Sequence, residues 1–271
     1  MGLRINTNTP ALNTSRVLNR STQALNRSLE RLSSGLRINR AADDAAGLTI
    51  AEGFYSQVRG TQVAQRNAQD GVSLVQTAEG ALSETTNILQ RIRELAVQAA
   101  NGTQSTNNRV ALDNEVKQLL GQIDSIAKDT QFNGISVLSA AQTVTLQAGA
   151  MTSQTLVITV SGAKTSDLGV SSVSLSTMAT AVSAISTIDT ALRSVTSLRS
   201  SFGAYQNRLE FTINTLAIQE ENSAASESAI RDANIAAETI GFTRNQILVS
   251  AGTSVLAQAN VVPQTALQLL R

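Results

Sequence analysis

A long stripe of apolar and small residues between positions 64 and 99 constrains the fold of this chain more than any other feature. Its members recur in steps of three and four, the spacing of one face of an α-helix. They are Ala64, Ala68, Gly71, Val75, Ala78, Leu82, Thr85, Leu89, Ile92, Ala96 and Ala99. A spacing sustained this long is typical of a coiled-coil seam. A helix over residues 57–100 would be about 65 Å long, so the stripe predicts a rod of packed helices.

Shorter stripes predict helices on both sides of this one. Residues 11–38 carry apolar residues at heptad spacing, with a break or bend at 33–35. The heptad residues are Ala11, Leu18, Leu25 and Leu32. A third helix follows a turn at 101–103 and forms an antiparallel hairpin with the second. Its stripe is Leu112, Val116, Leu119, Ile123 and Ile126, and it stops near 132–134.

The middle of the chain has a different pattern. Apolar residues alternate with Thr and Gln around residues 144–146 and with Val and Thr in 156–160, which predicts a β-hairpin. Residues 161–177 are rich in Ser and Thr, and we expect them to form an exposed loop. Helix resumes from about 181, and a final helix covers about 230–270.

The two terminal helices are amphipathic, and neither can bury its apolar stripe alone. A fully buried Leu or Ile contributes roughly 1.5–3 kcal/mol, so we expect the two ends to pair with each other and then to associate with other chains. The predicted fold is therefore mainly α. It consists of long antiparallel coiled-coil helices, with paired N- and C-terminal helices and a small β-hairpin in the middle.

The residue types that many enzymes use are missing. The chain has no His and no Cys, which excludes the common metal-ligand sets, the usual proton shuttle and any thiol nucleophile. Asp43 and Asp44 could be paired acid/base carboxylates, but a helix cap is the better interpretation. A net charge of +1 argues against a nucleic-acid surface. No stretch approaches the ~20 apolar residues of a membrane span. We expect a non-enzymatic building block of a fibre, with no cofactor, no nucleic-acid partner and no membrane partner.

One surface of the second helix has a less obvious purpose. Gln90, Arg91 and Leu95 fall off the seam, and we expect them to share an outward strip. A solvated face with a single apolar residue is one interpretation of this strip. A contact between two chains that pack side by side is the other.

Motifs in both terminal thirds identify a family. They are residues 5–8 (INTN), 31–39 (RLSSGLRIN), 42–48 (ADDAAGL), 76–82 (QTAEGAL), 89–98 (LQRIRELAVQ), 132–134 (FNG), 203–210 (GAYQNRLE) and 256–260 (LAQAN). On these residues the chain resembles the bacterial flagellins, the subunits of the flagellar filament. It resembles a short type without large outer domains.

The resemblance implies a domain organisation. Residues 1–43 with 230–271 would be the inner-core helices, and residues 44–138 with 179–229 the outer-core bundle. Residues 139–178 would be the hairpin and exposed loop of the outer core. Inner-core assembly is expected of Leu18, Leu25, Leu32, Leu248, Val255 and Leu256.

The resemblance also implies partners and a location. The chain would leave the cell unfolded through the flagellar type III apparatus, consistent with the lack of a secretory signal in its first residues. Partners would be other copies of the chain, an export chaperone at the C-terminal helix, and hook-associated and cap proteins. Family members are also recognised by an animal Toll-like receptor. The residues of this sequence that match the family's receptor-contact motif are Gln90, Arg91, Leu95 and Glu115. The same surface would be an axial subunit contact in the filament.

The sequence leaves three alternatives to flagellin. A hook–filament junction protein of the same superfamily shares the paired terminal helices, but it typically has Pro where this chain has residues 42–46. A secreted coiled-coil effector would not need matched motifs at both ends. An enzyme would need a cluster of Asp, Glu and Lys on facing helices, and the sequence predicts none.

Overall fold

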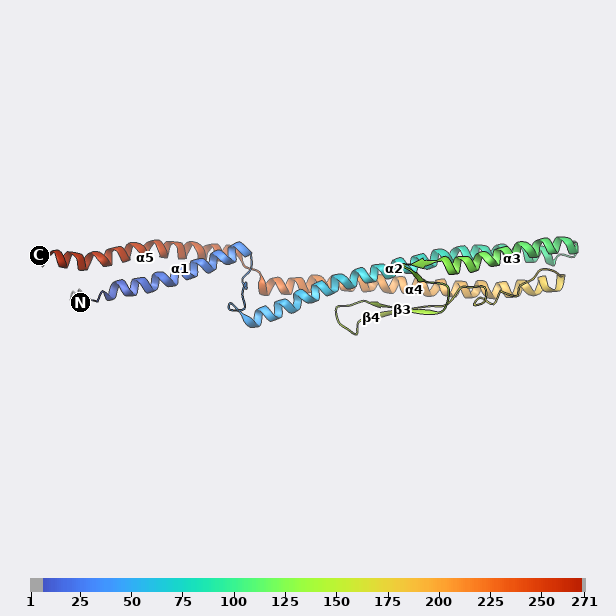
Figure 1. Ribbon diagram of the computed structural model, residues 1–271, viewed down its shortest axis with the longest axis horizontal. Coiled ribbons are helices and arrows are strands. Elements are labelled where there is room, and N and C mark those ends of the chain that lie inside the picture. The colour runs from blue at the N-terminus through green and yellow to red at the C-terminus, as the bar shows by residue number, and fades with distance from the viewer. Residues whose placement is uncertain (1–6, 270–271) are drawn as a thin grey trace. The chain divides into compact units, whose positions relative to one another are not determined.

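The computed structural model describes residues 7–269, and the chain divides into two compact units. The terminal unit combines residues up to 56 with residues from 222 onward, and the central unit is 57–221. The elements are α1 (Thr9–Ser34), α2 (Ala45–Ala100), α3 (Thr106–Asp129), β1 (Gln131–Phe132), β2 (Ile135–Ser136), β3 (Gln142–Gln147), β4 (Thr155–Val160), α4 (Met178–Arg231) and α5 (Ile235–Leu269). The predicted, mainly helical fold is confirmed (Figure 1). Ile5, Asn6 and the predicted helix end at 270 lie outside the described residues.

The ends of α1 follow from local chemistry. The Asn8 side chain accepts a hydrogen bond from the backbone N–H of Ala11, and Pro10 lies in the first turn, where a missing N–H costs nothing. The helix ends at Gly35, whose φ of 73° is the left-handed conformation that glycine adopts without strain. The predicted break at 33–35 is confirmed, and the helix therefore ends before Ile38, the predicted end.

The second helix starts earlier than its apolar stripe indicated. Asp44 accepts a hydrogen bond from the backbone N–H of Gly47 at 2.9 Å, so it caps α2 at Ala45, as one of the two predicted capping carboxylates. Asp43 accepts instead from the N–H groups of Arg40 and Asn39. The hydrogen bond from Arg40, followed by that from Asn39, lowers the pKa of Asp43.

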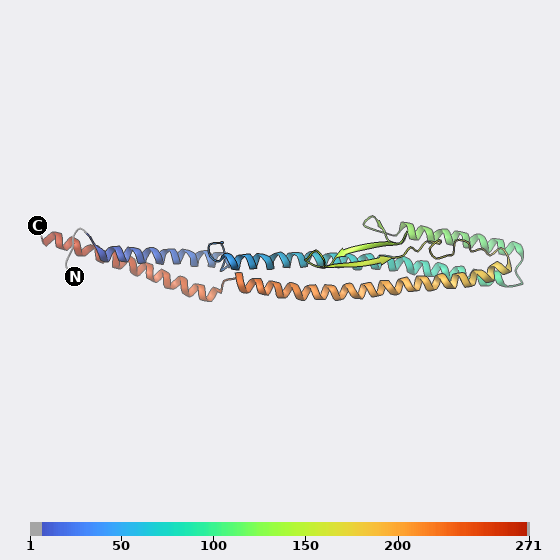
Figure 2. The same cartoon turned by 90° about the horizontal axis from the view of Figure 1, so that it is seen from below.

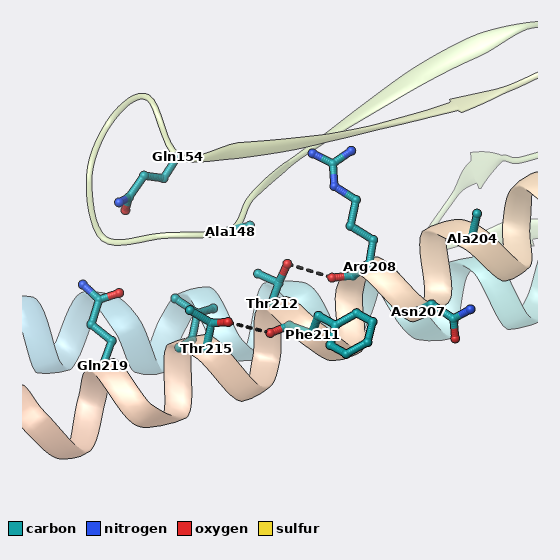
Figure 3. A pocket seen from close by; sticks show the side chains of 10 residues that line it. Ala148, Gln154, Ala204, Asn207, Arg208, Phe211, Thr212, Thr215 and Gln219 are labelled. Atoms are coloured by element: carbon teal, nitrogen blue, oxygen red, sulfur yellow. Dashed lines mark hydrogen bonds between the residues drawn. The ribbon is translucent and has the colours of Figure 1, made fainter.

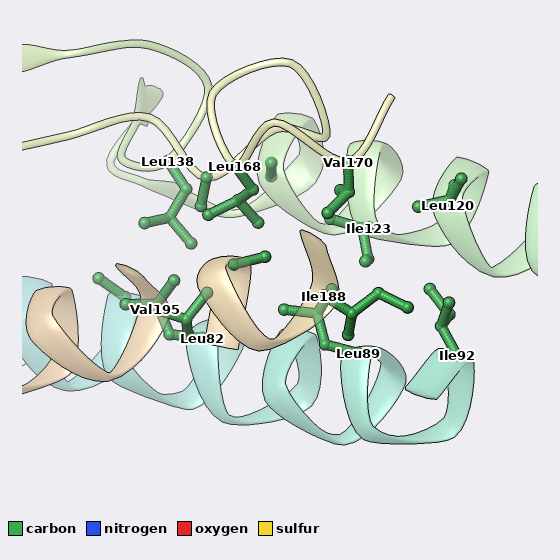
Figure 4. Close-up of a cluster of buried hydrophobic side chains, with 14 of the residues drawn as sticks. Leu82, Leu89, Ile92, Leu120, Ile123, Leu138, Leu168, Val170, Ile188 and Val195 are labelled. Atoms are coloured by element: carbon green, nitrogen blue, oxygen red, sulfur yellow. The ribbon is translucent and has the colours of Figure 1, made fainter. Parts of the chain in front are cut away.

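The central unit is built on α2 and α4, which run antiparallel (Figures 1 and 2). Three contacts between the two helices show this direction, because the residue number of the α4 partner decreases as the residue number of the α2 partner increases. They are Gln62 to Glu220, Glu79 to Arg199 and Arg93 to Asp189. Every member of the predicted α2 stripe is buried. Figure 4 shows α2 side chains meeting those of α3 and α4 in one core.

Two hairpins follow α3. The predicted hairpin is confirmed as β3 and β4, with Val144 opposite Ile158 and Leu146 opposite Leu156. The sequence predicts only a helix stop at residues 132–134, but residues 133–134 also form the turn between β1 and β2. Asn133 and Gly134 have φ of 49° and 77°, and this pair of positive φ angles suits a two-residue hairpin turn.

The prediction of an exposed loop at 161–177 is wrong. This segment, called the strap below, has buried apolar side chains that complete the central core. They are Ala163, Leu168, Val170, Val173 and Leu175. Its polar groups bind carboxylates of α3: Asp124 accepts from the N–H and hydroxyl of Thr165, at 2.8 and 2.9 Å. Because its polar groups are hydrogen-bonded to these carboxylates, a Ser/Thr-rich segment can lie against an apolar core.

Candidate assembly surfaces

The first candidate surface is the antiparallel pair of α1 and α5 in the terminal unit (Figure 1). Arg31 lies 3.8 Å from Glu238 near one end of the pair, and the Asn8 amide donates to the carbonyl of Ala259 near the other. The helices approach closely at glycine. A Cβ added to Gly252 would lie 3.2 Å from Leu18 Cδ1, which is tighter than ordinary packing.

The seam of this pair alternates large and small residues. The predicted heptad residues Leu18, Leu25 and Leu32 are half-buried, and the positions between them are Ser21 and Ser28, which are buried. On α5, Leu256 is also half-buried. Leu248 and Val255 are exposed by 46% and 55%, so the pair itself leaves them uncovered. The six predicted inner-core residues thus divide into seam residues and outward-facing residues.

The terminal unit lacks a core of its own. Among the described residues, Ile38 and Ala51 are its buried apolar residues, whereas the other buried apolar residues belong to 57–221. The outer faces of its helices expose large apolar side chains. These are Leu12, Val17 and Leu29 on α1, and Ile235, Ile240, Ile247, Leu248, Val255 and Val261 on α5. So much exposed apolar surface marks an interaction site.

The second candidate surface is the predicted strip on α2. Arg91 is exposed and bonds Glu115 of α3 at 3.0 Å and Glu94 at 3.1 Å. The hydrogen bonds that Arg91 donates, first to Glu115 and then to Glu94, raise the pKa of Arg91 above its ordinary value. Gln90 is also exposed. The structure therefore brings Arg91 and Glu115 together, although they lie on different helices.

Leu95 does not share this outward strip, and that prediction is wrong. Its side chain is 1% exposed and belongs to the central core. The reason is that α3 folds back along α2, with Arg109 donating to the carbonyl of Ala99 at 2.9 Å. A helix packed on two sides buries residues outside its main seam, so the single stripe gave too narrow an estimate of the buried face.

A third surface was missed in the sequence. Residues of α4 and the tip of the β3–β4 hairpin enclose an open groove of about 640 Å³ (Figure 3). Phe211 lines it and is 73% exposed. Arg208, one turn earlier, lines it too. The available signal was an aromatic residue outside the apolar register of α4, in a chain with only five Phe.

Within residues 7–269, no group of three or more His, Cys, Asp or Glu is placed to hold a metal ion. In the same part of the chain, no helix combines the length and the apolar character needed to cross a membrane.

Family models and related proteins identify the same family for this chain. Residues 5–143 match the bacterial flagellin N-terminal helical region, and residues 185–270 match the bacterial flagellin C-terminal helical region. The chain is 46% identical over 270 residues to the flagellin of Halalkalibacterium halodurans, covering 98% of this chain and 99% of that protein. It is 42% identical over 304 residues to the flagellin of Bacillus subtilis, covering 99% and 100%. It is 43% identical over 284 residues to a flagellar filament core protein of Treponema maltophilum, covering 98% and 99%.

A solved structure shares the fold at lower identity. The structure of a putative flagellar hook-associated protein from Vibrio parahaemolyticus has a TM-score of 0.58 and 11% identity, covering 70% of this chain and all of that chain. This likeness concerns the fold alone. The matches along the whole chain decide between the junction-protein alternative and flagellin. The chain belongs to the bacterial flagellins, and it is a non-enzymatic structural subunit of the extracellular flagellar filament used in motility.

Proposed function

We propose that the terminal unit is the part of this flagellin that neighbouring subunits complete during assembly. In this scheme residues 1–43 with 230–271 form the inner core. Residues 44–138 with 179–229 form the outer core, and residues 139–178 lie at its flank. One observation carries the proposal. Among described residues, the terminal unit buries Ile38 and Ala51 while nine large apolar side chains stay exposed on α1 and α5.

The driving force is burial of these outer faces between copies. Leu18, Leu25, Leu32 and Leu256 hold the two helices of one chain together, while Leu248 and Val255 are available to a neighbour. Contacts between unlike faces of successive copies form an open helical fibre when their rotation does not close a ring, whereas contacts between like faces form a dimer.

Deletion and substitution test this proposal at two levels. Removing residues 230–271 should leave a soluble protein that does not polymerise, because α5 is absent. Ile240→Ser with Ile247→Ser should also block seeded polymerisation, because both side chains are 63% exposed in the single chain. Val157→Ser, a similar change on the exposed face of β4, is the matched control. Filaments formed by the truncation, or by the α5 double variant as readily as by the wild type, would contradict the proposal.

We also propose that a Toll-like receptor recognises the monomer at Gln90, Arg91 and Glu115, and that the same surface makes an axial contact in the filament. The exposed Arg91–Glu115 ion pair supports this, since it presents charge and hydrogen-bonding groups on two adjacent helices. Leu95 was assigned to this contact from the family resemblance, but it is buried, so its part would be to hold α2 and α3 in place.

Receptor reporter cells treated with purified monomer test this second proposal. Arg91→Ala should lose signalling with unchanged folding, whereas Leu95→Ala should lose signalling together with stability. An Arg91→Ala monomer as active as the wild type would refute the receptor assignment.

We further propose that an export chaperone binds α5 and that hook-associated and cap proteins bind at the filament ends. The exposed apolar face of α5 supports the chaperone, because an unfolded exported chain needs that face shielded before assembly. Calorimetry with the purified flagellar export chaperone is the test. Wild-type chain should bind, and the Ile240→Ser, Ile247→Ser variant should bind more weakly. Equal affinities would oppose the assignment to this face.

A further inference from the structure

Phe211 and Arg208 of α4, which line the groove beside the β3–β4 hairpin, are both exposed and are together called the ridge below. Phe211 is 73% exposed, more than any other large apolar residue among those described. Arg208 is exposed, and its guanidinium forms no ion pair or side-chain hydrogen bond within the described part of the chain. The two residues are three positions apart and therefore share one face of the helix. Aromatic residues, including Phe, and Arg are enriched at protein interfaces relative to the rest of the surface.

A different face of the central unit has the complementary features. The acceptor groove lies between α2 and α3 and has a volume of about 380 Å³. Its lining includes Gly80, Ala81 and Ile126, together with the exposed carboxylates of Glu84 and Asp129. A Cβ added to Gly80 would meet no atom within 4 Å, so the space above this glycine is open. Within the described residues, neither carboxylate has an ion-pair partner.

We propose that the ridge of one subunit docks in the acceptor groove of a second copy of this chain. The ring of Phe211 would lie over Gly80, Ala81 and Ile126, and Arg208 would pair with Glu84 or Asp129. This contact rests on the proposed packing of copies in the filament, and it would be one of the contacts between those copies.

Two arguments favour a second copy as the occupant. The first is charge complementarity, because a cation without a partner on one face matches two carboxylates without partners on another. The second is the kind of contact. Ridge and groove are different surfaces of the same chain, so docking leaves a free ridge and a free groove on every growing end. Such a contact extends a fibre, whereas a self-complementary patch would close a dimer.

Charge exchange within one chain tests the contact, because every copy in the polymer then carries both changes. Arg208→Glu should raise the critical concentration for seeded polymerisation roughly tenfold or more, since like charges then meet at the groove. Adding Glu84→Arg or Asp129→Arg to Arg208→Glu should return the critical concentration to within about threefold of wild type. Phe211→Ser should raise it without any charge change. Far-UV circular dichroism and thermal unfolding of each monomer should match the wild type, because the altered side chains are exposed.

The matched control combines Arg208→Glu with Asp70→Arg. Asp70 is an exposed carboxylate of α2 outside the groove, so this variant has the same net charge as the rescued one. It should remain impaired. The proposal is overturned if Arg208→Glu and Phe211→Ser polymerise like wild type. It is also overturned if neither groove variant rescues, or if the Asp70 control rescues equally well. Failure of the wild-type chain itself to polymerise would instead count against the assembly scheme.

Discussion

Asp113 of α3 accepts a hydrogen bond from the backbone N–H of Leu175, with 2.6 Å between nitrogen and Oδ1, although the residues are 62 positions apart. The same carboxylate accepts from the hydroxyl of Ser174 at 2.9 Å and lies 2.7 Å from Lys117 Nζ. Asp124 binds Thr165 farther along the strap. Two carboxylates of one helix thus hold the strap against the core that Leu168, Val170 and Leu175 complete.

Removing the Asp113 carboxylate should loosen the strap. In Asp113→Ala the buried N–H of Leu175 loses its acceptor, and an unsatisfied buried donor costs about 1–3 kcal/mol. Urea unfolding at neutral pH measures the loss in the free energy of unfolding. Asp113→Asn keeps an acceptor oxygen and serves as the control, with a smaller loss expected. An Ala variant as stable as the wild type would show that the strap does not depend on this contact.

The same carboxylate should make stability depend on pH in the acid range. Burial opposes the ionisation of Asp113, but Lys117, the Leu175 N–H and the Ser174 hydroxyl outweigh it, and the net effect lowers its pKa below the ordinary 3.8. The unfolded chain binds the proton more readily than the folded chain. The contribution of Asp113 is therefore complete above the unfolded pKa and is lost as pH falls through the lower, folded pKa. Unfolding free energies at several pH values should fall less steeply for Asp113→Asn than for wild type, and identical slopes would oppose this role.

Shortening Leu95 should destabilise the central unit. Leu95 is 1% exposed, and Leu→Ala changes in cores cost about 2–5 kcal/mol. Val97 is 50% exposed two positions away, and Val97→Ala should change stability by less than about 0.5 kcal/mol. Thermal unfolding of both monomers compares them directly. Equal melting temperatures for the two variants would indicate that Leu95 is not packed as the structure has it.

Two glycines on different helices of the terminal unit should respond in opposite ways. A Cβ at Gly53 of α2 meets nothing within 4 Å, so Gly53→Ala should stabilise the helix by roughly 0.5–1 kcal/mol. At Gly252 the added Cβ lies 3.2 Å from Leu18 Cδ1, and the bulkier Gly252→Val should force α1 and α5 apart. Sedimentation of seeded mixtures should show a raised critical concentration for Gly252→Val and no rise for Gly53→Ala. The reverse order would contradict the close approach of the two helices.

The sequence predicted the regular parts of the fold well. The α2 stripe, the bend at 33–35 and the β3–β4 hairpin could be predicted because local spacing and turn chemistry determine them. The strap could not, since its burial depends on Asp113 and Asp124, which no local pattern connects to it.

The candidate surfaces were predicted less completely. Arg91 and Glu115 were named together from family resemblance, and their contact depends on how α3 folds back on α2. The burial of Leu95 has the same cause. Phe211 and the acceptor groove were missed, because a groove between elements leaves no periodic mark in the sequence.

Hydrogen exchange, followed by mass spectrometry in monomer and filament, tests the central claim most directly. If neighbouring subunits cover the outer faces of α1 and α5, amides of these helices should exchange quickly in the monomer and become strongly protected in the filament. Amides around Leu82 in the buried core of α2 should be protected in both states and provide the internal reference. Equal protection of α1 and α5 in monomer and filament would contradict the claim, because the terminal unit would then be stable without its neighbours.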